Sequence, residues 1–306
     1  MFRRKRGVAW FVVAIMVIGL FIANQCVKEE AKKMIAEKKQ TQQIIVLGDS
    51  LVEICLDLGL RKNLVAVSYL GKDIPELMGI RHLGGPQNLS EEQLAGITSD
   101  LIIASDSVEL KQRIQTMISE QRVPIIFLKH DSFADILTDI KEISEAMGID
   151  GVGERVTRDI LKKIDVTRKL PENAPKVLMV YSTSAGEDQK YKSFACIDQG
   201  TFHDEILRSA GGVNAIDNST KRWPTLSIED LIRINPDIII DFRPDFEGKP
   251  DDVVKMWQNT VPTTTVKAIA NKQVYLISDH YALLPSTKIV KVHDEIKNIL
   301  ESAHKK

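Results

Sequence analysis

Cysteine is scarce in this sequence, with three residues among 306, and this scarcity excludes two classes of small stabilised domain. Cys26, Cys55 and Cys196 are too few to form a disulfide framework. They are also spaced too widely for the ligand pattern of a zinc site. We therefore expect buried thiols in a fold that depends on its apolar core.

An excess of basic charge is also absent. The formal net charge is −1, and four of the 41 basic residues lie together at residues 3–6, so the rest of the chain is acidic overall. A nucleic-acid-binding protein concentrates Lys and Arg on one surface. The composition therefore argues against a nucleic-acid partner.

One long uncharged run follows that basic cluster. Residues 7–23 carry no charge, and these 17 residues exceed the apolar region of a signal peptide, typically about 7 to 15 residues. Their number reaches the lower limit for a membrane-spanning helix. A basic flank stays on the cytoplasmic side, which would place the remainder of the chain outside. We predict a membrane anchor or signal segment at 1–26 and a charged spacer at 27–43.

The residues before Cys26 indicate whether that segment is cleaved, lipidated or retained. Residues 23–25 read Ala-Asn-Gln, which is not the small-x-small pattern of a cleavage site. The same residues lack the small side chains that usually precede a lipidated cysteine. A retained anchor is therefore favoured over cleavage or a lipid at Cys26.

A fifteen-residue stretch occurs twice. Residues 89–103 and 226–240 share eight identical positions at an offset of 137 residues. Each copy begins with a serine that can cap a short helix, and Gln93 or Asp230 completes a capping box. Each copy ends in an apolar run typical of a buried parallel strand. The repeat predicts two equivalent lobes, which agrees with a prior of about 100 to 200 residues per domain.

Strands and helices alternate from residue 44 onward, which predicts an α/β fold with two Rossmann-like lobes. No turn-rich linker separates them, so a single long helix is the expected connection. The predicted boundaries are 44–148 for the N-terminal lobe, 149–171 for the connecting helix and 172–306 for the C-terminal lobe. Ligands of parallel sheets bind beyond the carboxyl ends of the strands, so we expect the ligand cleft between the lobes.

The stretch Gly48-Asp49-Ser50-Leu51 resembles the opening motif of the GDSL esterases, in which the serine is the nucleophile. That chemistry needs a histidine base, which in that family stands three residues after an aspartate. The position three before each of the six histidines holds Gly, Phe, Ile, Val or Glu. We therefore expect no enzyme, and a GDSL-type hydrolase is the weakest of the alternatives.

Several short motifs follow one another along the chain. They are Glu53-Ile54, Leu58-Gly59, Gly200-Thr201-Phe202, Ala210-Gly211-Gly212-Val213-Asn214, Leu226-Ser227 with Glu229, and Asn235-Pro236-Asp237. From about residue 44 to the end, this order resembles the periplasmic binding proteins that serve importers of ferric siderophores, haem and cobalamin. The resemblance implies a monomeric extracytoplasmic protein, without a cofactor of its own, that delivers a metal chelate to an ABC importer. The alternative is an extracytoplasmic ligand sensor without a transport role.

Two places are similar to the cobalamin branch of that family. Trp223-Pro224 directly precedes the second repeat, and Ser278-Asp279 is followed by His280 and Tyr281, at positions that cradle a corrin in that branch. The chain departs from the branch at Gly84-Gly85, where an aromatic residue is expected. Siderophore and haem therefore stay open as ligands.

The candidate ligand-binding residues lie beside the ends of predicted strands. They are Tyr69, Trp223, Arg243, Asp279, His280 and Tyr281. Trp223 is held extended by the following proline and offers a flat surface, although it could equally be a lobe-core aromatic. Tyr69 could stack on a ligand or bind haem iron through its phenolate.

One arginine and two histidines are further candidates for contact with a ligand or a metal. Arg243 can fork onto ligand carboxylates, and its alternative is a surface ion pair with Asp245. His82 and His203 fall in predicted loops, where we expect them to be solvated rather than to bind metal. No spacing indicates a metal site belonging to the protein itself.

Glu92 and Glu229 occupy the second position of the two repeated helices. A carboxylate there complements the helix N-terminus, which is worth about 0.3 to 1 kcal/mol. The resemblance implies a second role, in which one glutamate per lobe docks against arginines of the permease subunits. This role requires both carboxylates to be exposed and far apart.

The uncharged run generates the first prediction. We expect the mature protein to stay bound to the membrane with its lobes outside, so that detergent is required to release it. Fractionation of native membranes with and without detergent checks this. Recovery of a soluble form that begins near residue 26 would contradict a retained anchor.

Overall fold

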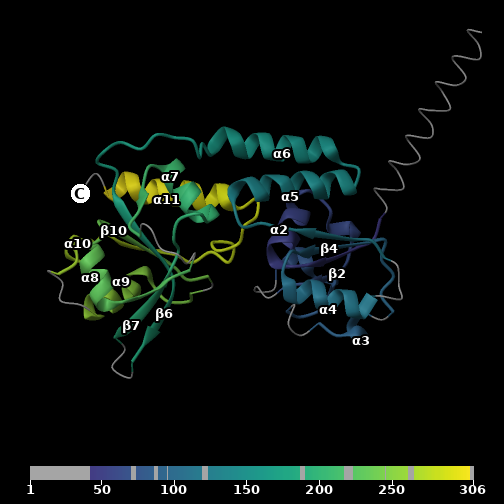
Figure 1. Ribbon diagram of the computed structural model, residues 1–306, viewed down its shortest axis with the longest axis horizontal. Coiled ribbons are helices and arrows are strands. Elements are labelled where there is room, and N and C mark those ends of the chain that lie inside the picture. The colour runs from purple at the N-terminus through teal and green to yellow at the C-terminus, as the bar shows by residue number, and fades with distance from the viewer. Residues whose placement is uncertain are drawn as a thin grey trace, which may run out of the picture.

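The computed structural model shows two α/β lobes side by side, with helices α5 (Phe133–Ala146) and α6 (Asp150–Lys163) along one side of the molecule (Figure 1). It describes residues 42–69, 74–85, 89–94, 96–118, 123–186, 190–216, 223–244, 246–260 and 265–303. The predicted anchor at 1–26, with Cys26, and nearly all of the spacer at 27–43 lie outside these residues. Within them, none of the helices has the length and apolar character needed to cross a membrane.

The first lobe is built on a five-stranded parallel sheet in the order β3-β2-β1-β4-β5. Its strands are β1 (Ile44–Leu47), β2 (Leu64–Ser68), β3 (Arg81–His82), β4 (Leu101–Ser105) and β5 (Ile125–Leu128). Its other helices are α2 (Asp49–Asp57), α3 (Glu91–Leu94), α4 (Val108–Ile118) and the short η1 (Arg61–Asn63) and η2 (Pro75–Leu77). All four residues of β1 are buried, as expected for a central parallel strand covered on both faces.

The second lobe has a mixed sheet in the order β11-β10-β6-β7-β9, with β8 also paired to β6. Its strands are β6 (Lys176–Ala185), β7 (Tyr191–Cys196), β8 (Val213–Asn214), β9 (Thr225–Ser227), β10 (Ile238–Phe242) and β11 (Val274–Ile277). Its helices are α7 (Phe202–Ala210), α8 (Ile228–Ile234), α9 (Pro250–Thr260), α10 (Lys267–Ala270) and α11 (Ile289–Ala303). The sheet is mixed because β7 follows β6 and pairs with it in the antiparallel direction.

Both capping boxes predicted for the repeat are present. Ser90 Oγ accepts from the Gln93 N–H at 3.2 Å, and the Ser90 N–H donates to Gln93 Oε1 at 2.9 Å. Ser227 and Asp230 form the same two bonds at 3.1 Å each. The repeated sequence therefore has the same local structure in both lobes.

The repeated aspartates also have equivalent partners. Asp100 accepts from the Gln43 N–H at 2.8 Å just before β1, and Asp237 accepts from the Lys176 N–H at 3.0 Å at the start of β6. Each aspartate thereby aligns its strand with the first strand of its own lobe. The strand order β2-β1-β4-β5 in one lobe corresponds to β8-β6-β10-β11 in the other. The prediction of two equivalent α/β lobes is confirmed.

Helix α6 ends at Lys163 and is shorter than the predicted connecting helix at 149–171, because residues 164–175 lead into β6 without helical structure. It packs against α5, where Gly153 lies so close to Ser144 that a Cβ would clash with that side chain. The lobe boundaries predicted at residues 148 and 172 stay predictions.

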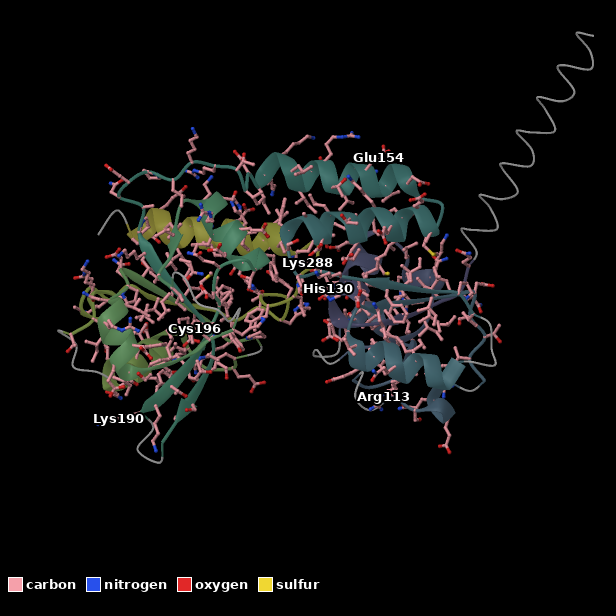
Figure 2. The ribbon with its side chains drawn as sticks, viewed as in Figure 1. Arg113, His130, Glu154, Lys190, Cys196 and Lys288 are labelled. Carbon is pink, nitrogen blue, oxygen red and sulfur yellow. The ribbon has the colours of Figure 1, made fainter. Side chains whose placement is uncertain are left out.

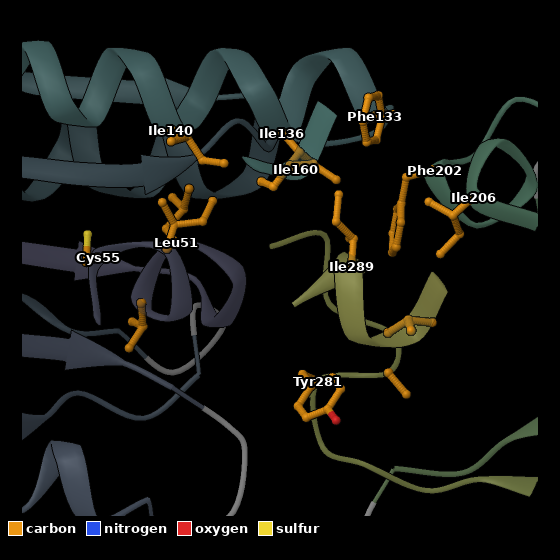
Figure 3. Close-up of a cluster of buried hydrophobic side chains, with 14 of the residues drawn as sticks. Leu51, Cys55, Phe133, Ile136, Ile140, Ile160, Phe202, Ile206, Tyr281 and Ile289 are labelled. Carbon is orange, nitrogen blue, oxygen red and sulfur yellow. The ribbon is translucent and has the colours of Figure 1, made fainter. Parts of the chain in front are cut away.

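One apolar cluster runs through both lobes (Figure 3). Leu51, Ile136 and Ile160 enter it from the side of the first lobe, and Phe202 and Ile289 enter it from the second. Two hydrogen bonds join the same elements, from the Phe133 N–H to Glu205 Oε2 at 2.6 Å and from the Phe202 N–H to the Asp131 carbonyl at 3.3 Å. The lobes are therefore held together by shared core packing as well as by the chain connection.

Candidate functional site

A pocket of about 280 Å³ lies between the lobes. The first lobe contributes side chains from α2 and from the segment around η2, and the second contributes the segment after β11 and the start of α11. The lining residues are Glu53, Leu56, Asp57, Ile74, Glu76, His280, Tyr281, Lys288 and Lys291. Figure 2 shows Lys288 where the two lobes meet. The pocket is slightly smaller than the volumes typical of small-molecule sites, roughly 300 to 1,000 Å³.

The Glu53 carboxylate is the centre of the polar contacts in this pocket. Glu53 is 3% exposed, and its Oε1 accepts a hydrogen bond from Tyr69 Oη at 3.1 Å. His280 Nε2 of the opposite lobe lies 3.1 Å from the same oxygen, and Lys288 Nζ lies 4.0 Å from Oε2. Two predicted site residues, Tyr69 and His280, are thus brought together by a carboxylate.

Asp57 makes a second connection one helical turn along α2. Its carboxylate pairs with Lys288 Nζ at 2.6 Å and accepts a hydrogen bond from Thr287 Oγ1. Both partners belong to the second lobe. The acidic face of α2 therefore meets a cationic segment of the other lobe.

Tyr281 forms part of the wall of the pocket. It is 8% exposed, and Lys291 Nζ lies 5.2 Å from the centre of its ring. Burial raises the pKa of Tyr281, and the nearby Asp279 and Glu295 carboxylates raise it further. The phenol therefore stays protonated and serves as a neutral packing and hydrogen-bonding group, while Asp279 is exposed beside it.

Trp223 is 46% exposed, so the structure does not bury it in the core of a lobe. Its ring meets Tyr181 edge to face, with ring centres 5.2 Å apart. Tyr181 follows the part of β6 that pairs in parallel with β10, so the two rings lie at the carboxyl edge of the second sheet. The buried tryptophan of this lobe is Trp257, whose Nε1 donates to Asp241 at 2.9 Å.

Arg243 is already paired within its own lobe. Its Nε and Nη2 donate to the buried Asp241 carboxylate at 3.0 and 2.9 Å, and Nη2 also donates to Tyr191 Oη. Burial lowers the pKa of Arg243, but the hydrogen bonds and charge of Asp241 outweigh it, so the net pKa is raised. Asp245, the partner considered from sequence, lies outside the described residues. The guanidinium therefore acts first as a counter-ion for Asp241.

Both histidines expected in loops were predicted to be solvated, and one of them is not. His82 is exposed, but His203 is fully buried in α7, so its predicted solvation was wrong. Its Nε2 lies 3.0 Å from the Ala282 carbonyl, and burial lowers the pKa of His203 to about 4, so the ring is neutral. Among the described residues, no group of three or more His, Cys, Asp or Glu could hold a metal ion.

Cys55 and Cys196 are buried free thiols, which confirms that prediction for both. Burial raises the pKa of the Cys55 thiol to about 12, so it is not reactive. Ser50, the serine of the esterase-like motif, is only 5% exposed within α2. An acyl-transfer nucleophile needs access to its substrate, so the burial of Ser50 also argues against the hydrolase.

Gly84 lies where an aromatic residue was expected from the cobalamin branch. Its φ of +70° belongs to the left-handed region that favours glycine, and its carbonyl accepts from Ser68 Oγ at 2.6 Å. An aromatic side chain at this position would be strained. The aromatic residue expected in the first lobe is therefore absent at this position, and the exposed tryptophan in the described part of the chain is Trp223 of the second lobe.

Glu92 and Glu229 are both exposed, one on α3 of the first lobe and one on α8 of the second. Figure 1 shows these two helices in different lobes and away from α6. The pKa of Glu229 is lowered, first by a hydrogen bond from its own backbone N–H and then by the Ser227 hydroxyl. The exposure agrees with the docking role, which stays a prediction.

The sequence interpretation missed Asp57, Thr287 and Lys288 altogether, and used Glu53 only as a family motif. One signal was available, because Asp49, Glu53 and Asp57 recur every four residues along one face of α2. Glu53 also interrupts an otherwise apolar run. The partners in the other lobe carry no comparable local signal.

The chain belongs to the periplasmic binding protein family, because the model of that family matches residues 44–281. The Vitamin B12-binding protein of Vibrio parahaemolyticus is 22% identical over 266 residues, which cover 87% of this chain and 91% of that protein. The Vitamin B12-binding protein of Vibrio cholerae is 23% identical and covers 89% of this chain and 94% of its own length.

Solved structures show the same fold. The periplasmic haem-binding protein HutB of Vibrio cholerae matches with a TM-score of 0.71 at 23% identity, over 85% of this chain and 99% of that one. A possible iron-binding protein from Staphylococcus epidermidis matches with a TM-score of 0.69 at 21% identity, also over 85% and 99%.

Membership of this family defines the class of protein. Its members are extracytoplasmic solute-binding proteins that work with the permeases of ABC importers. They carry a ligand as cargo rather than a cofactor, and they are not enzymes. The chain is therefore a substrate-binding protein of this class.

The exposed Trp223 generates a prediction about binding. We expect a bulky metal chelate to quench intrinsic tryptophan fluorescence, and Trp223→Ala to weaken its affinity by roughly 1 to 3 kcal/mol. Titrations of the wild type and the variant measure both effects. Ile232→Ala, at an exposed apolar residue of the same lobe, should leave affinity unchanged. Equal affinity of Trp223→Ala and the wild type would contradict a contact with the ligand.

Proposed function

We propose that this protein captures a corrinoid such as cobalamin between its lobes and delivers it to an ABC importer. The observation that carries the choice of a large flat ligand is the exposed Trp223 ring, held edge to face on Tyr181. A rigid aromatic surface at the carboxyl edge of a sheet suits a macrocycle, because it offers area at a low cost in conformational entropy. The names of the similar Vibrio proteins support the same ligand class.

The contacts of Tyr69 favour a corrinoid over ferric haem. Its hydroxyl donates to Glu53, and the residue is 6% exposed. A phenolate ligand to iron would place a second negative charge 3.1 Å from the Glu53 carboxylate, at a site shielded from water. A chelate whose metal is already fully coordinated needs no such ligand.

The size of the interlobe pocket also bears on the proposal. A macrocycle exceeds the 280 Å³ of the pocket, so most of the ligand would extend beyond it. Polar groups on the edge of the ligand can meet His280, Lys288 and Lys291 in the pocket. The proposal therefore divides recognition between a flat aromatic contact and a charged pocket.

The remaining parts of the proposal concern the assembly. The uncharged run at 7–23 would tether a monomer to the membrane outside the cytoplasm. Glu92 and Glu229 would dock the two lobes on the permease subunits, since charge pairs of this kind orient a partner more than they add affinity.

A panel titration tests the ligand. The purified protein is titrated with cyanocobalamin, haemin and a ferric hydroxamate siderophore, and binding is measured by calorimetry and by the visible spectrum of the complex. We expect the tightest binding for cyanocobalamin. Tighter binding of either iron ligand would overturn the corrinoid assignment, and binding of none would overturn chelate capture.

The two exposed glutamates generate a prediction about transport. Glu92→Ala together with Glu229→Ala should leave folding and ligand affinity nearly unchanged but abolish ligand-dependent ATPase stimulation of the reconstituted importer. The matched control is Glu109→Ala with Asp251→Ala, which removes one exposed carboxylate from each lobe elsewhere. Stimulation that survives in the first pair would reduce both glutamates to helix caps. If the wild-type protein also fails to stimulate the ATPase of the importer, this result would favour the alternative that the protein is a ligand sensor without a transport role.

A further inference from the structure

Glu53 is the one described carboxylate that contacts both Tyr69 of its own lobe and His280 of the other. We infer that Glu53 is a positioning residue of the ligand pocket, which holds the side chains of Tyr69 and His280 in fixed orientations. The inference rests on the proposed function, because it assigns Glu53 to the binding of the same ligand. It adds a residue that acts on the ligand through two others.

The burial of Glu53 makes its partners obligatory. The residue is 3% exposed, within the buried stretch Leu51–Cys55 of α2. A carboxylate removed from water is costly unless hydrogen bonds compensate its charge. Tyr69 and His280 supply those bonds to Oε1, and Lys288 lies 4.0 Å from Oε2. Rotation of either ring away from Glu53 therefore costs free energy.

The contact also selects one tautomer of His280. An ionised carboxylate only accepts hydrogen bonds, so Nε2 must carry the proton that is shared with Glu53. In the neutral ring, Nδ1 is then the acceptor. His280 is partly exposed and lines the pocket, so in the neutral ring the nitrogen that does not contact Glu53 is a defined acceptor.

Asp57 provides a matched control on the same helix. It also joins the lobes, through Lys288 at 2.6 Å and Thr287, but none of its described bonds reaches Tyr69 or His280. Asp57→Asn therefore removes a contact between the lobes without removing a partner of either ring. A residue that only holds the lobes together should behave like Asp57, and a positioning residue should not.

The first experiment needs no ligand. Nitrogen NMR of the full chain with labelled histidine reports the tautomer of each ring, and the His280 signal is assigned by its loss in His280→Gln. We expect a single tautomer with a protonated Nε2 in the wild type and in Asp57→Asn, and a mixture of tautomers in Glu53→Ala. The same single tautomer in a folded Glu53→Ala would overturn the inference.

The second experiment measures affinity for cyanocobalamin. Glu53→Ala should weaken binding by about tenfold, and Glu53→Gln by less, because the amide oxygen still accepts a hydrogen bond. Asp57→Asn should weaken binding less than Glu53→Ala does, because it leaves the partners of both rings in place. In a His280→Gln background, Glu53→Ala should add little further loss, since coupled residues are not additive. Equal losses for Glu53→Ala and Asp57→Asn would contradict positioning.

The two experiments separate this inference from the proposed function. Failure of the wild type to bind any chelate overturns the proposed function, whereas the tautomer of His280 is measured without ligand. If Glu53→Ala does not fold, the inference is tested by the affinity of Glu53→Gln and by the tautomer of His280 in the wild type. A wild-type His280 that shows a mixture of tautomers would overturn the inference on its own.

Discussion

The apolar core shared by the two lobes is the constraint on which the rest of the structure depends. Leu51, Ile136 and Ile160 pack in one cluster with Phe202 and Ile289, and each buried side chain of this kind contributes about 1.5 to 3 kcal/mol. Moving the lobes far apart would expose these side chains to water. The pocket between the lobes is therefore largely preformed.

A preformed pocket explains why its charged groups already have partners. Glu53 contacts Tyr69 and His280, and Asp57 contacts Thr287 and Lys288, so these side chains are oriented before a ligand arrives. Such order lowers the entropic cost of binding. Trp223 differs from them, because nearly half of its surface is exposed to water. An apolar surface of this kind gains free energy when a ligand covers it.

Much of the fold could be predicted because it depends on residues close together in sequence. The capping boxes at Ser90 and Ser227 span three residues, and the apolar runs at β4 and β10 specify buried strands by themselves. The site could be predicted only in part, because Glu53 and His280 are 227 positions apart. Their pairing follows from how the lobes pack, which local patterns do not encode. The same reason accounts for His203, whose burial depends on Ala282 and Phe242.

The two lobes share one scaffold but differ where the site is built. In the first lobe, helix α2 begins directly after strand β1 and carries Glu53 and Asp57. In the second lobe the antiparallel strand β7 intervenes before the equivalent helix α7, and β9 follows Trp223 and pairs with β7. The first lobe thus supplies the buried carboxylate of Glu53 and the exposed carboxylate of Asp57, whereas the second supplies an exposed aromatic ring and the cationic Lys288 that meets those carboxylates. A duplicated fold accounts for the position of the pocket between the lobes, and the two lobes contribute chemically different side chains to it, carboxylates from the first and lysines from the second.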